Sequence, residues 1–201
     1  MRLFAGIELP SNITDQLTLW WESERGYLDP DHWRPVAPHL WHLTLAFYGE
    51  VSGGDVDDLA EELAECSRNA KALTLKTGNF GFFPRASKPR VFWVGVDEAG
   101  DGDGLKHLAR CCRRAGHATV RKRTATEAPF RGHITVARVR GHAALPDMEQ
   151  LQMMADVPVL DWGVQRINLY QSILRPEGPQ YRRLETFELN GSSNRTRGKY
   201  V

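Results

Sequence analysis

A chain of 201 residues is long enough to bury a sizeable core, as one compact domain or as two small lobes sharing a sheet. Its 41% hydrophobic and 25% charged residues are ordinary for a globular protein, and a net charge of +1 does not by itself predict a nucleic-acid partner. No apolar run approaches ~18 residues and no signal-peptide pattern precedes Leu3, so we expect neither a membrane span nor a secretion signal.

The first part of the chain alternates strand and helix patterns. Ser11 is a good N-cap and Gly26 a helix stop, while three prolines mark the segment before Trp41 as irregular. In order, we expect a strand over 3–9, a helix over 12–25, a loop over 27–40, a strand over 41–48, a helix over about 55–70 and a strand over 73–80.

The remainder repeats this alternation and adds one strand. In order, we expect a loop over 83–89, a strand over 90–97, a helix over about 102–115, a strand over 132–139, a helix from Pro146 to about Asp156, strands over 164–174 and 181–189, and a mobile tail over 191–201. The order is therefore βαβαβ twice, with an extra strand.

Three similarities at nearly one offset indicate an internal duplication. The segment 4–8, Phe-Ala-Gly-Ile-Glu, resembles 93–97, Trp-Val-Gly-Val-Asp, at an offset of 89. His42 and His133 lie 91 residues apart, and so do the expected helix starts at 55 and 146. We therefore predict one domain over 1–190 with two pseudo-symmetric halves, about 1–82 and 90–190. Equivalent residues should face one another across a central cleft.

Two copies of a His-apolar-Thr-apolar motif, HxTx, lie in two of the expected strands. They are His42-Leu43-Thr44-Leu45 and His133-Ile134-Thr135-Val136. Side chains of a strand alternate between faces, so the histidine and threonine of each copy share one face and the apolar residues share the other. A single copy is a weak signal, because a strand histidine is more often a core residue. Two copies at equivalent positions of a repeat predict a catalytic site.

Two facing imidazoles suit acid–base catalysis without a metal. With an ordinary pKa near ~6.5, one ring can be neutral and accept a proton while the other is charged and donates one. The hydroxyls of Thr44 and Thr135 could hold the non-bridging oxygens of a phosphate. This set fits cleavage of a phosphodiester. No carboxylate lies close to either motif at ligand spacing, Glu50 and Glu127 being the nearest, so a metal centre is disfavoured.

Several further residues are candidates for substrate contact. Arg131 lies two residues before His133 and shares its face, which favours a phosphate contact. Arg138 lies five residues after His133, on the opposite face unless a bulge re-aims it. Phe130 and Phe47 could stack on a base, although strand aromatics are usually core. Residues 121–123, Arg-Lys-Arg, are either a contact for a nucleic-acid backbone or a solvated loop.

The three cysteines form neither a disulfide framework nor a CxxC zinc pattern. Cys111 and Cys112 are adjacent in a helical pattern, where packing is the ordinary role. We therefore expect reduced thiols and a cytoplasmic protein.

The chain resembles the two-histidine (2H) phosphoesterase superfamily, and within it the bacterial and archaeal RNA 2′,3′-cyclic phosphodiesterases, also called 2′-5′ RNA ligases. Nearly the whole chain takes part. Besides the two HxTx motifs, the resemblance rests on 2–10, Phe47 with Gly49-Glu50, 89–96, Phe130-Arg131, Ala137-Arg138, 169–172 and 178–181.

The resemblance implies an α+β fold of two duplicated lobes, with antiparallel sheets lining a central cleft and helices outside. It implies hydrolysis of RNA 2′,3′-cyclic phosphate ends to 2′-phosphates without metal or other cofactor, and 2′-5′ ligation in vitro. His42 would be the general acid, His133 the general base, and Thr44 and Thr135 phosphate ligands. Arg138 matches a family arginine that approaches the phosphate.

Two departures from the family pattern bear on substrate binding. Ala46 stands where relatives often have lysine, and Gly132 where they often have proline; the glycine should loosen the approach to His133. Two alternative functions stay open: a phosphodiesterase for small cyclic nucleotides or 2′-5′ oligonucleotides, and a non-catalytic module that binds RNA ends. We expect a monomer.

Overall fold

A computed structural model describes residues 1–120, 128–141, 148–176 and 178–190. Within these residues the strands are β1 (Arg2–Glu8), β2 (Trp33–Pro35), β3 (His42–Glu50), β4 (Leu73–Arg85), β5 (Lys88–Glu98), β6 (His133–Val139), β7 (Asp161–Val164), β8 (Arg166–Arg175) and β9 (Gly178–Glu188). The helices are α1 (Ser11–Glu24), α2 (Val56–Arg68), α3 (Gly104–Thr119) and the short α4 (Met148–Leu151), with 3₁₀ turns at Arg25–Tyr27, Pro38–Leu40 and Gly53–Asp55.

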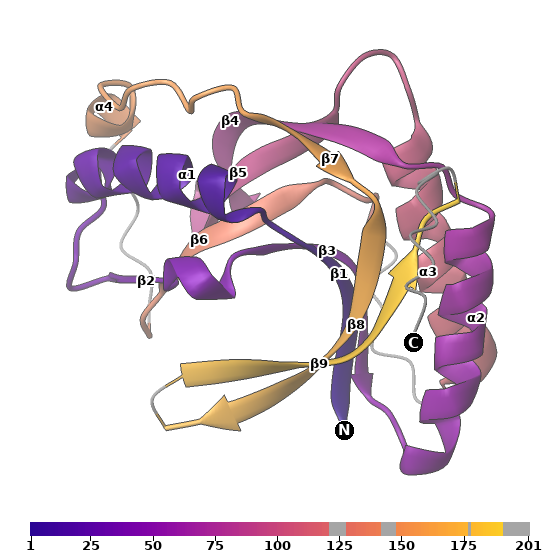
Figure 1. Ribbon diagram of the computed structural model, residues 1–201. Helices are drawn as coiled ribbons and strands as arrows, with labels where there is room; N and C mark the ends of the chain where they lie inside the picture. The colour runs from indigo at the N-terminus through magenta and orange to yellow at the C-terminus, as the bar shows by residue number, and fades with distance from the viewer. Residues whose placement is uncertain (121–127, 142–147, 177, 191–201) are drawn as a thin grey trace, which may run out of the picture.

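The strands form one curled antiparallel sheet in the order β7-β4-β5-β6-β3-β1-β8-β9, with β2 added beside β6 (Figure 1). The β6–β3 pair stands at the middle of this order, and those two strands carry the HxTx motifs. Leu43 and Ile134 are the residues paired between them. The expected α+β fold with two antiparallel lobes is confirmed. The duplication is visible in the order, since β1 and β5 flank the central pair on opposite sides.

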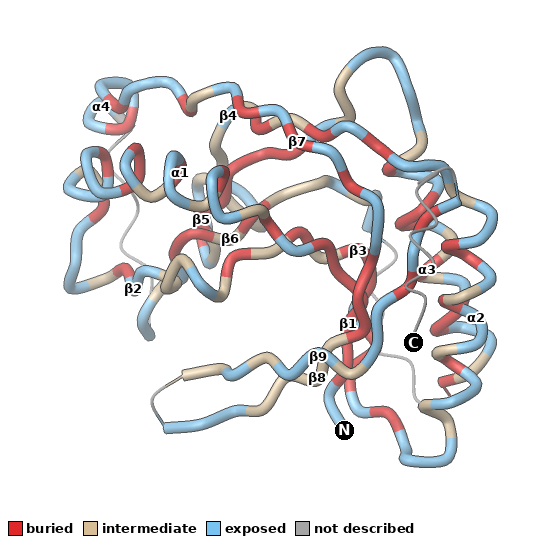
Figure 2. Tube along the Cα trace, viewed as in Figure 1, coloured by how far each residue is buried: buried red, intermediate tan, exposed pale blue. Residues whose placement is uncertain are grey.

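Helices cover the outside of the curled sheet (Figure 1). Helices α2 and α3 lie together beside the lobe of β1 and β3, and α1 packs on the other lobe, where the Trp21 ring lies 5.7 Å from that of Phe92 in β5. The sides of the helices that face the sheet are buried (Figure 2), and so are strands β1 and β3 in large part. The hairpin of β8 and β9 extends away from this core, and its far end is exposed or half-buried.

Most expected elements are confirmed, and the differences lie where tertiary contacts decide. The loop expected over 83–89 is wrong. Strand β4 extends to Arg85, strand β5 begins at Lys88, and the two pair as a tight hairpin. Strand β2, inside the expected loop 27–40, and strand β7 were not predicted. Both are short and owe their conformation to a neighbour, β6 and β4 respectively.

The helix expected to reach Asp156 is also wrong, because α4 ends at Leu151. The chain after it runs beside β4, where the Thr77 hydroxyl accepts a hydrogen bond from the Leu160 amide at 2.8 Å and donates one to the Pro158 carbonyl. These tertiary bonds hold this segment in an extended path. Pro146, residues 121–123 and the tail over 191–201 lie outside the described residues.

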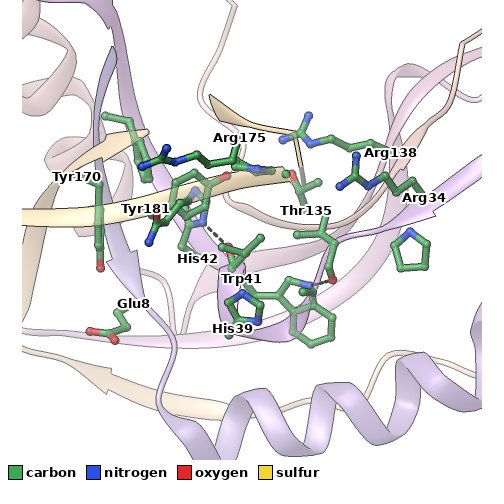
Figure 3. A pocket seen from close by; sticks show the side chains of 18 of the residues that line it. Glu8, Arg34, His39, Trp41, His42, Thr135, Arg138, Tyr170, Arg175 and Tyr181 are labelled. Carbon is green, nitrogen blue, oxygen red and sulfur yellow. Dashed lines mark hydrogen bonds between the residues drawn. The ribbon is translucent and has the colours of Figure 1, made fainter. Parts of the chain in front are cut away.

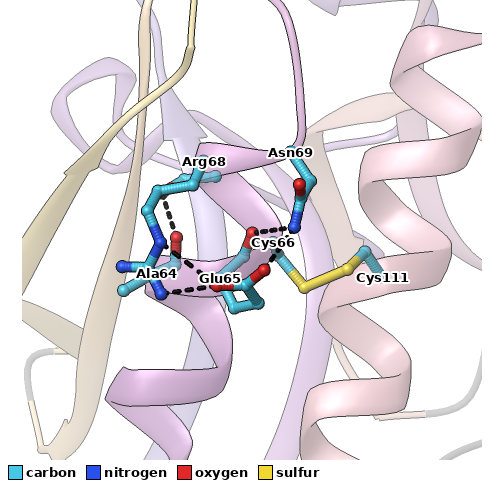
Figure 4. A network of polar contacts seen from close by, with 7 residues as sticks. Ala64, Glu65, Cys66, Arg68, Asn69 and Cys111 are labelled. Atoms are coloured by element: carbon cyan, nitrogen blue, oxygen red, sulfur yellow. Dashed lines mark hydrogen bonds and ion pairs between the residues drawn. A yellow bond between two sulfur atoms is a disulfide. The ribbon is translucent and has the colours of Figure 1, made fainter.

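The expectation of reduced thiols is wrong for two of the three cysteines. Cys66 of α2 and Cys111 of α3 form a disulfide, with their Cα atoms 5.7 Å apart (Figure 4). Cys112 is free and buried, and burial raises the pKa of its thiol to about 12. The bridge depends on the side-by-side packing of two helices that are separated by 45 residues in sequence, so no local spacing indicated it. No described helix is long and apolar enough to cross a membrane.

Candidate active site

The two HxTx motifs meet at the centre of the sheet. Leu43 and Ile134, which pair across β3 and β6, are both fully buried in the core. Strand alternation then directs the neighbouring His42, Thr44, His133 and Thr135 to the opposite face, where all four are partly exposed. In an antiparallel pair this register sets His42 across from Thr135, and Thr44 across from His133. The structure thus brings the four side chains together.

Both histidines are held in the same orientation by their own backbone. His42 Nδ1 lies 2.7 Å from the Leu40 carbonyl oxygen, and His133 Nδ1 lies 2.8 Å from that of Arg131. A carbonyl can only accept, so Nδ1 carries the proton in each ring and donates it. The other nitrogen, Nε2, is then left to accept a proton when the ring is neutral or to donate one when it is charged.

Aromatic rings pack around each imidazole. The His42 ring centroid lies 4.8 Å from that of Phe4 and 5.0 Å from that of Tyr181. The His133 centroid lies 4.8 Å from that of Phe83 and 6.4 Å from that of Trp93. Phe4 and Trp93 occupy equivalent positions of the repeat, so the duplication extends to the walls around the histidines.

Burial shifts the protonation of both rings. It lowers the pKa of His42 to about 4, with the positive charge of Arg138 adding to the effect. Burial also lowers the pKa of His133, again assisted by Arg138. The Nδ1 hydrogen bonds oppose these shifts without cancelling them. Both histidines are therefore neutral near pH 7 in the substrate-free protein, and a bound anion would favour the charged form of either.

A matching β-bulge lies at the last residue of each motif. The pairing of β5 with β6 passes from Trp93–Thr135 to Phe92–Ala137, which leaves Val136 unpaired. The pairing of β1 with β3 likewise passes over Leu45. Each bulge shifts the alternation by one residue, so two consecutive side chains are buried and the residue five after each histidine turns outward. Arg138 is thereby brought to the same face as His133, whereas regular strand alternation would place it on the opposite face.

A cavity of about 1010 Å³ opens beside His42 (Figure 3). Its lining includes His42, Thr135 and Arg138 from the expected set, whereas Thr44 and His133 lie outside the lining. The sequence reasoning had not singled out several other side chains that line it: Glu8, Arg34, His39, Tyr170, Arg175, Tyr181 and Arg183. The 178–181 segment was noted as part of a family resemblance, but no local pattern indicated that its hairpin would line this cavity.

Three of the expected substrate-contact residues lie elsewhere. The Arg131 guanidinium lies over the Trp93 ring at 4.3 Å from its centroid, away from the cavity beside His42. Phe130 packs against the core under the Arg113 guanidinium, at 5.6 Å. Phe47 is 40% exposed and lies under the Arg2 guanidinium at 5.0 Å, outside the cavity lining. Their roles in binding stay predictions, and none of them lines this cavity.

The donor set does not resemble a metal centre. Among the described residues, no group of three or more His, Cys, Asp or Glu side chains is placed to hold a metal ion. The one carboxylate among the described residues that lines the cavity, Glu8, is engaged with Arg183 at 3.3 Å. The site offers imidazoles, hydroxyls and guanidinium groups, which are partners for a phosphate.

Comparisons with known proteins identify the family of this chain. Residues 7–93 match the model of a family described as LigT like Phosphoesterase. The RNA 2′,3′-cyclic phosphodiesterase of Thermus thermophilus is 33% identical over 97% of this chain and 93% of its own. A crystal structure of a Thermus thermophilus protein superposes with a TM-score of 0.76 at 29% identity, covering 96% of this chain and all of that one. E. coli LigT complexed with 3′-AMP superposes with a TM-score of 0.71 at 29% identity, covering 94% and 97%. The chain therefore belongs to the LigT-like 2H phosphoesterases, a family of enzymes that includes the RNA 2′,3′-cyclic phosphodiesterases.

Proposed function

We propose that this enzyme hydrolyses the 2′,3′-cyclic phosphate at the end of an RNA chain and leaves a 2′-phosphate. The observation that carries this proposal is the pair of histidines on adjacent strands, each with Nδ1 bonded to a carbonyl and Nε2 left for proton transfer. The name of the Thermus thermophilus relative supports the substrate, and the 3′-AMP complex of E. coli LigT supports a nucleotide in the cleft.

The reaction follows from the roles proposed for these side chains. His133 Nε2 takes a proton from water, the water oxygen bonds to phosphorus, and the bond from phosphorus to the 3′ oxygen breaks as His42 Nε2 protonates that oxygen. Thr44, Thr135 and Arg138 stabilise the charge that develops on the non-bridging oxygens. No metal takes part in this scheme. Ligation in vitro would be the same displacement with the 5′ hydroxyl of a second RNA end in place of water: its oxygen bonds to phosphorus as the 3′ oxygen leaves, which gives a 2′-5′ linkage.

The acid role requires His42 to gain a proton. Its pKa of about 4 leaves it neutral in the free enzyme near pH 7. The negative charge of a bound phosphate favours the imidazolium form, so we infer that proton uptake accompanies substrate binding. The pair is nearly symmetric, and the product decides the assignment: a 2′-phosphate requires the acid beside the 3′ oxygen, whereas a 3′-phosphate requires the acid beside the 2′ oxygen.

The test replaces each histidine and follows an oligonucleotide that ends in a 2′,3′-cyclic phosphate. We expect His42→Ala and His133→Ala each to lower kcat by about 10²–10⁴-fold, because one positioned proton-transfer group is lost. His107→Ala, on the exposed side of α3, is the matched control and should turn over normally. Circular dichroism and thermal unfolding should show all three variants folded.

Two outcomes would contradict the proposal. One is turnover that survives in both active-site variants, and the other is turnover that stops with EDTA and returns with a divalent metal. Tight binding of an unchanged substrate would instead favour a module that binds RNA ends. A phosphodiesterase for small cyclic nucleotides or 2′-5′ oligonucleotides remains the alternative within the enzyme class, and comparing substrates of different length separates it.

A monomeric, cytoplasmic enzyme remains our prediction. Reduced thiols do not support a cytoplasmic location, since Cys66 and Cys111 form a disulfide. The prediction of a cytoplasmic location now rests on RNA as the proposed substrate.

A further inference from the structure

The cavity beside His42 extends past the four motif side chains to a second basic group. Strand β2 pairs with β6 so that Arg34 lies directly across from Arg138. Trp33 anchors β2, because it is only 3% exposed and its ring lies 5.8 Å from that of Phe82. Alternation then directs Arg34 to the face opposite Trp33, and both arginines line the cavity, as Figure 3 shows.

Arg34 also reaches the opposite wall of the cavity. Its Nη2 lies 3.0 Å from the position that a Cβ on Gly178 would occupy, and Gly178 begins β9 with a φ of +136°. A glycine there leaves room for the guanidinium against the backbone of the hairpin. Arg34 therefore spans from the β2 side of the cavity to the β8–β9 hairpin, which fixes where its charge can act.

Arg34 and Arg138 bring two guanidinium groups to the same cavity from paired positions of β2 and β6. Among the described residues, no carboxylate lies within the 4.0 Å of an ion pair from Arg138 or Arg175, and the nearby Arg183 is the arginine already paired with Glu8. Paired guanidinium groups are a good match for a phosphate, because each presents planar N–H donors.

The position of this pair differs from that of the reacting phosphate. Thr135 and His42 stand at the reacting end, and Arg138 follows Thr135 past the bulge, about one strand repeat of ~6.6 Å further along β6. That step is comparable with the spacing of successive phosphates in a single RNA strand. The cavity of about 1010 Å³ lies at the upper end of the ~300–1,000 Å³ range of small-molecule sites, so it has room for more than one nucleotide.

We propose that Arg34, with Arg138, binds the phosphodiester that precedes the cyclic end, so that the enzyme prefers an RNA chain of two or more nucleotides to a cyclic mononucleotide. This inference rests on the proposed function, and it assigns Arg34 to substrate selection. Arg138 serves both phosphates, since its charge also acts on His42 and His133. Arg34 acts on the second phosphate alone.

The experiment compares adenosine 2′,3′-cyclic phosphate with the dinucleotide ApA ending in a 2′,3′-cyclic phosphate. In Arg34→Gln we expect the ratio of kcat/KM for the dinucleotide over that for the mononucleotide to fall about tenfold, as for the loss of one charge-assisted hydrogen bond. The slope of log(kcat/KM) against log salt should also decrease by roughly 1 for the dinucleotide. Arg110→Gln, on the exposed side of α3, is the matched control and should preserve both ratio and slope.

A second substrate keeps the test independent of how the variant folds. A dinucleotide whose internal phosphodiester is replaced by a neutral methylphosphonate should lose at least about tenfold in kcat/KM with the unaltered enzyme, because the charge that both Arg34 and Arg138 contact is absent. It should lose nothing further with Arg34→Gln, because the charge that Arg34 contacts is already absent.

The assignment of Arg34 would be overturned if Arg34→Gln lowered kcat/KM equally for the mononucleotide and the dinucleotide. It would also be overturned if the losses of kcat/KM caused by the variant and by the methylphosphonate were additive. An unchanged ratio in Arg34→Gln would overturn it as well. Failure of the unaltered enzyme to turn over either substrate would instead overturn the proposed function. The two failures are thus distinguishable within one set of assays.

Discussion

Position 138 is one at which the two copies of the repeat differ in chemistry. Each bulge turns outward the residue five after its histidine, and that residue is Arg138 in β6 but Phe47 in β3. The guanidinium therefore stands on one side of a site that is otherwise built from equivalent parts. Its charge lowers the pKa of both histidines in the free enzyme. A bound phosphate would neutralise that charge and favour the imidazolium that acid catalysis requires.

The lowered pKa of His42 predicts a stability change with pH. The folded state holds His42 neutral down to about pH 4, whereas the unfolded chain protonates it near ~6.5. Between these values the unfolded state binds more protons, so the free energy of unfolding falls as the pH falls, by up to about 3 kcal/mol from this residue. Urea denaturation at several pH values across this window should show the loss, and His42→Gln should reduce it. An equal pH dependence in the two proteins would contradict the prediction.

A steric constraint, which the sequence did not reveal, requires glycine at position 132. From the sequence we expected this glycine to loosen the approach to His133. A Cβ at this position would lie 2.2 Å from the Val96 carbonyl oxygen, and that segment also donates a hydrogen bond from the Val96 amide to the Gly132 carbonyl at 3.0 Å. The glycine permits close packing of β5 against the start of β6, and so positions the strand that carries His133.

Among the individual elements, the bulge in strand β6 decides which face of the sheet the Arg138 side chain occupies. Alternation correctly directed His133 and Thr135 to one face, and it assigned Arg138 to the other. The extra residue Val136 reverses that assignment, and it is recognisable only from the pairing with β5. A register shift depends on the partner strand, so a pattern read along β6 by itself contains no signal for it.

The disulfide between α2 and α3 predicts a stability effect separate from catalysis. Bridging Cys66 to Cys111 closes a loop of 45 residues, for which unfolded-state entropy gives about 4 kcal/mol and typical measurements ~2–4 kcal/mol. We expect the double variant Cys66→Ala/Cys111→Ala to have a free energy of unfolding that is lower by an amount in this range, as measured by urea denaturation. The kcat for a cyclic phosphate substrate should be retained, because the bridge lies among the helices outside the sheet. Unchanged stability would contradict the expectation, and Cys112→Ala is not a suitable control, because that residue is buried.

Across the whole molecule, the two copies of the repeat are interlocked. Helix α1 packs on β5, and α3 packs on β3, where the Tyr48 hydroxyl donates to the Cys112 carbonyl at 3.1 Å. Strand β4 pairs with β5, and the late strand β8 pairs with β1. Each lobe is therefore completed by segments from the other part of the sequence, and the boundaries 1–82 and 90–190 cut through these pairings.

This interlocking predicts that neither sequence half folds alone. Residues 1–82 would lack both β5, the partner of β4, and β8, the outer partner of β1. Exposed strand edges and unpaired apolar faces should leave each fragment unfolded or aggregated. Separate expression of 1–82 and 90–190, followed by thermal unfolding monitored by circular dichroism, tests this. A cooperative transition in either isolated fragment would contradict it.

The secondary-structure alternation, the duplication and the polar face of His42, Thr44, His133 and Thr135 could all be predicted from sequence, because each depends on short-range periodicity or on internal similarity. The cavity with Arg34, the re-aimed Arg138 and the bridge from Cys66 to Cys111 became visible with the three-dimensional fold. These features require pairing between segments that are distant in sequence, and periodicity along one segment does not specify its partner. The four central side chains were thus foreseeable, whereas the side chains that would select among phosphates were not.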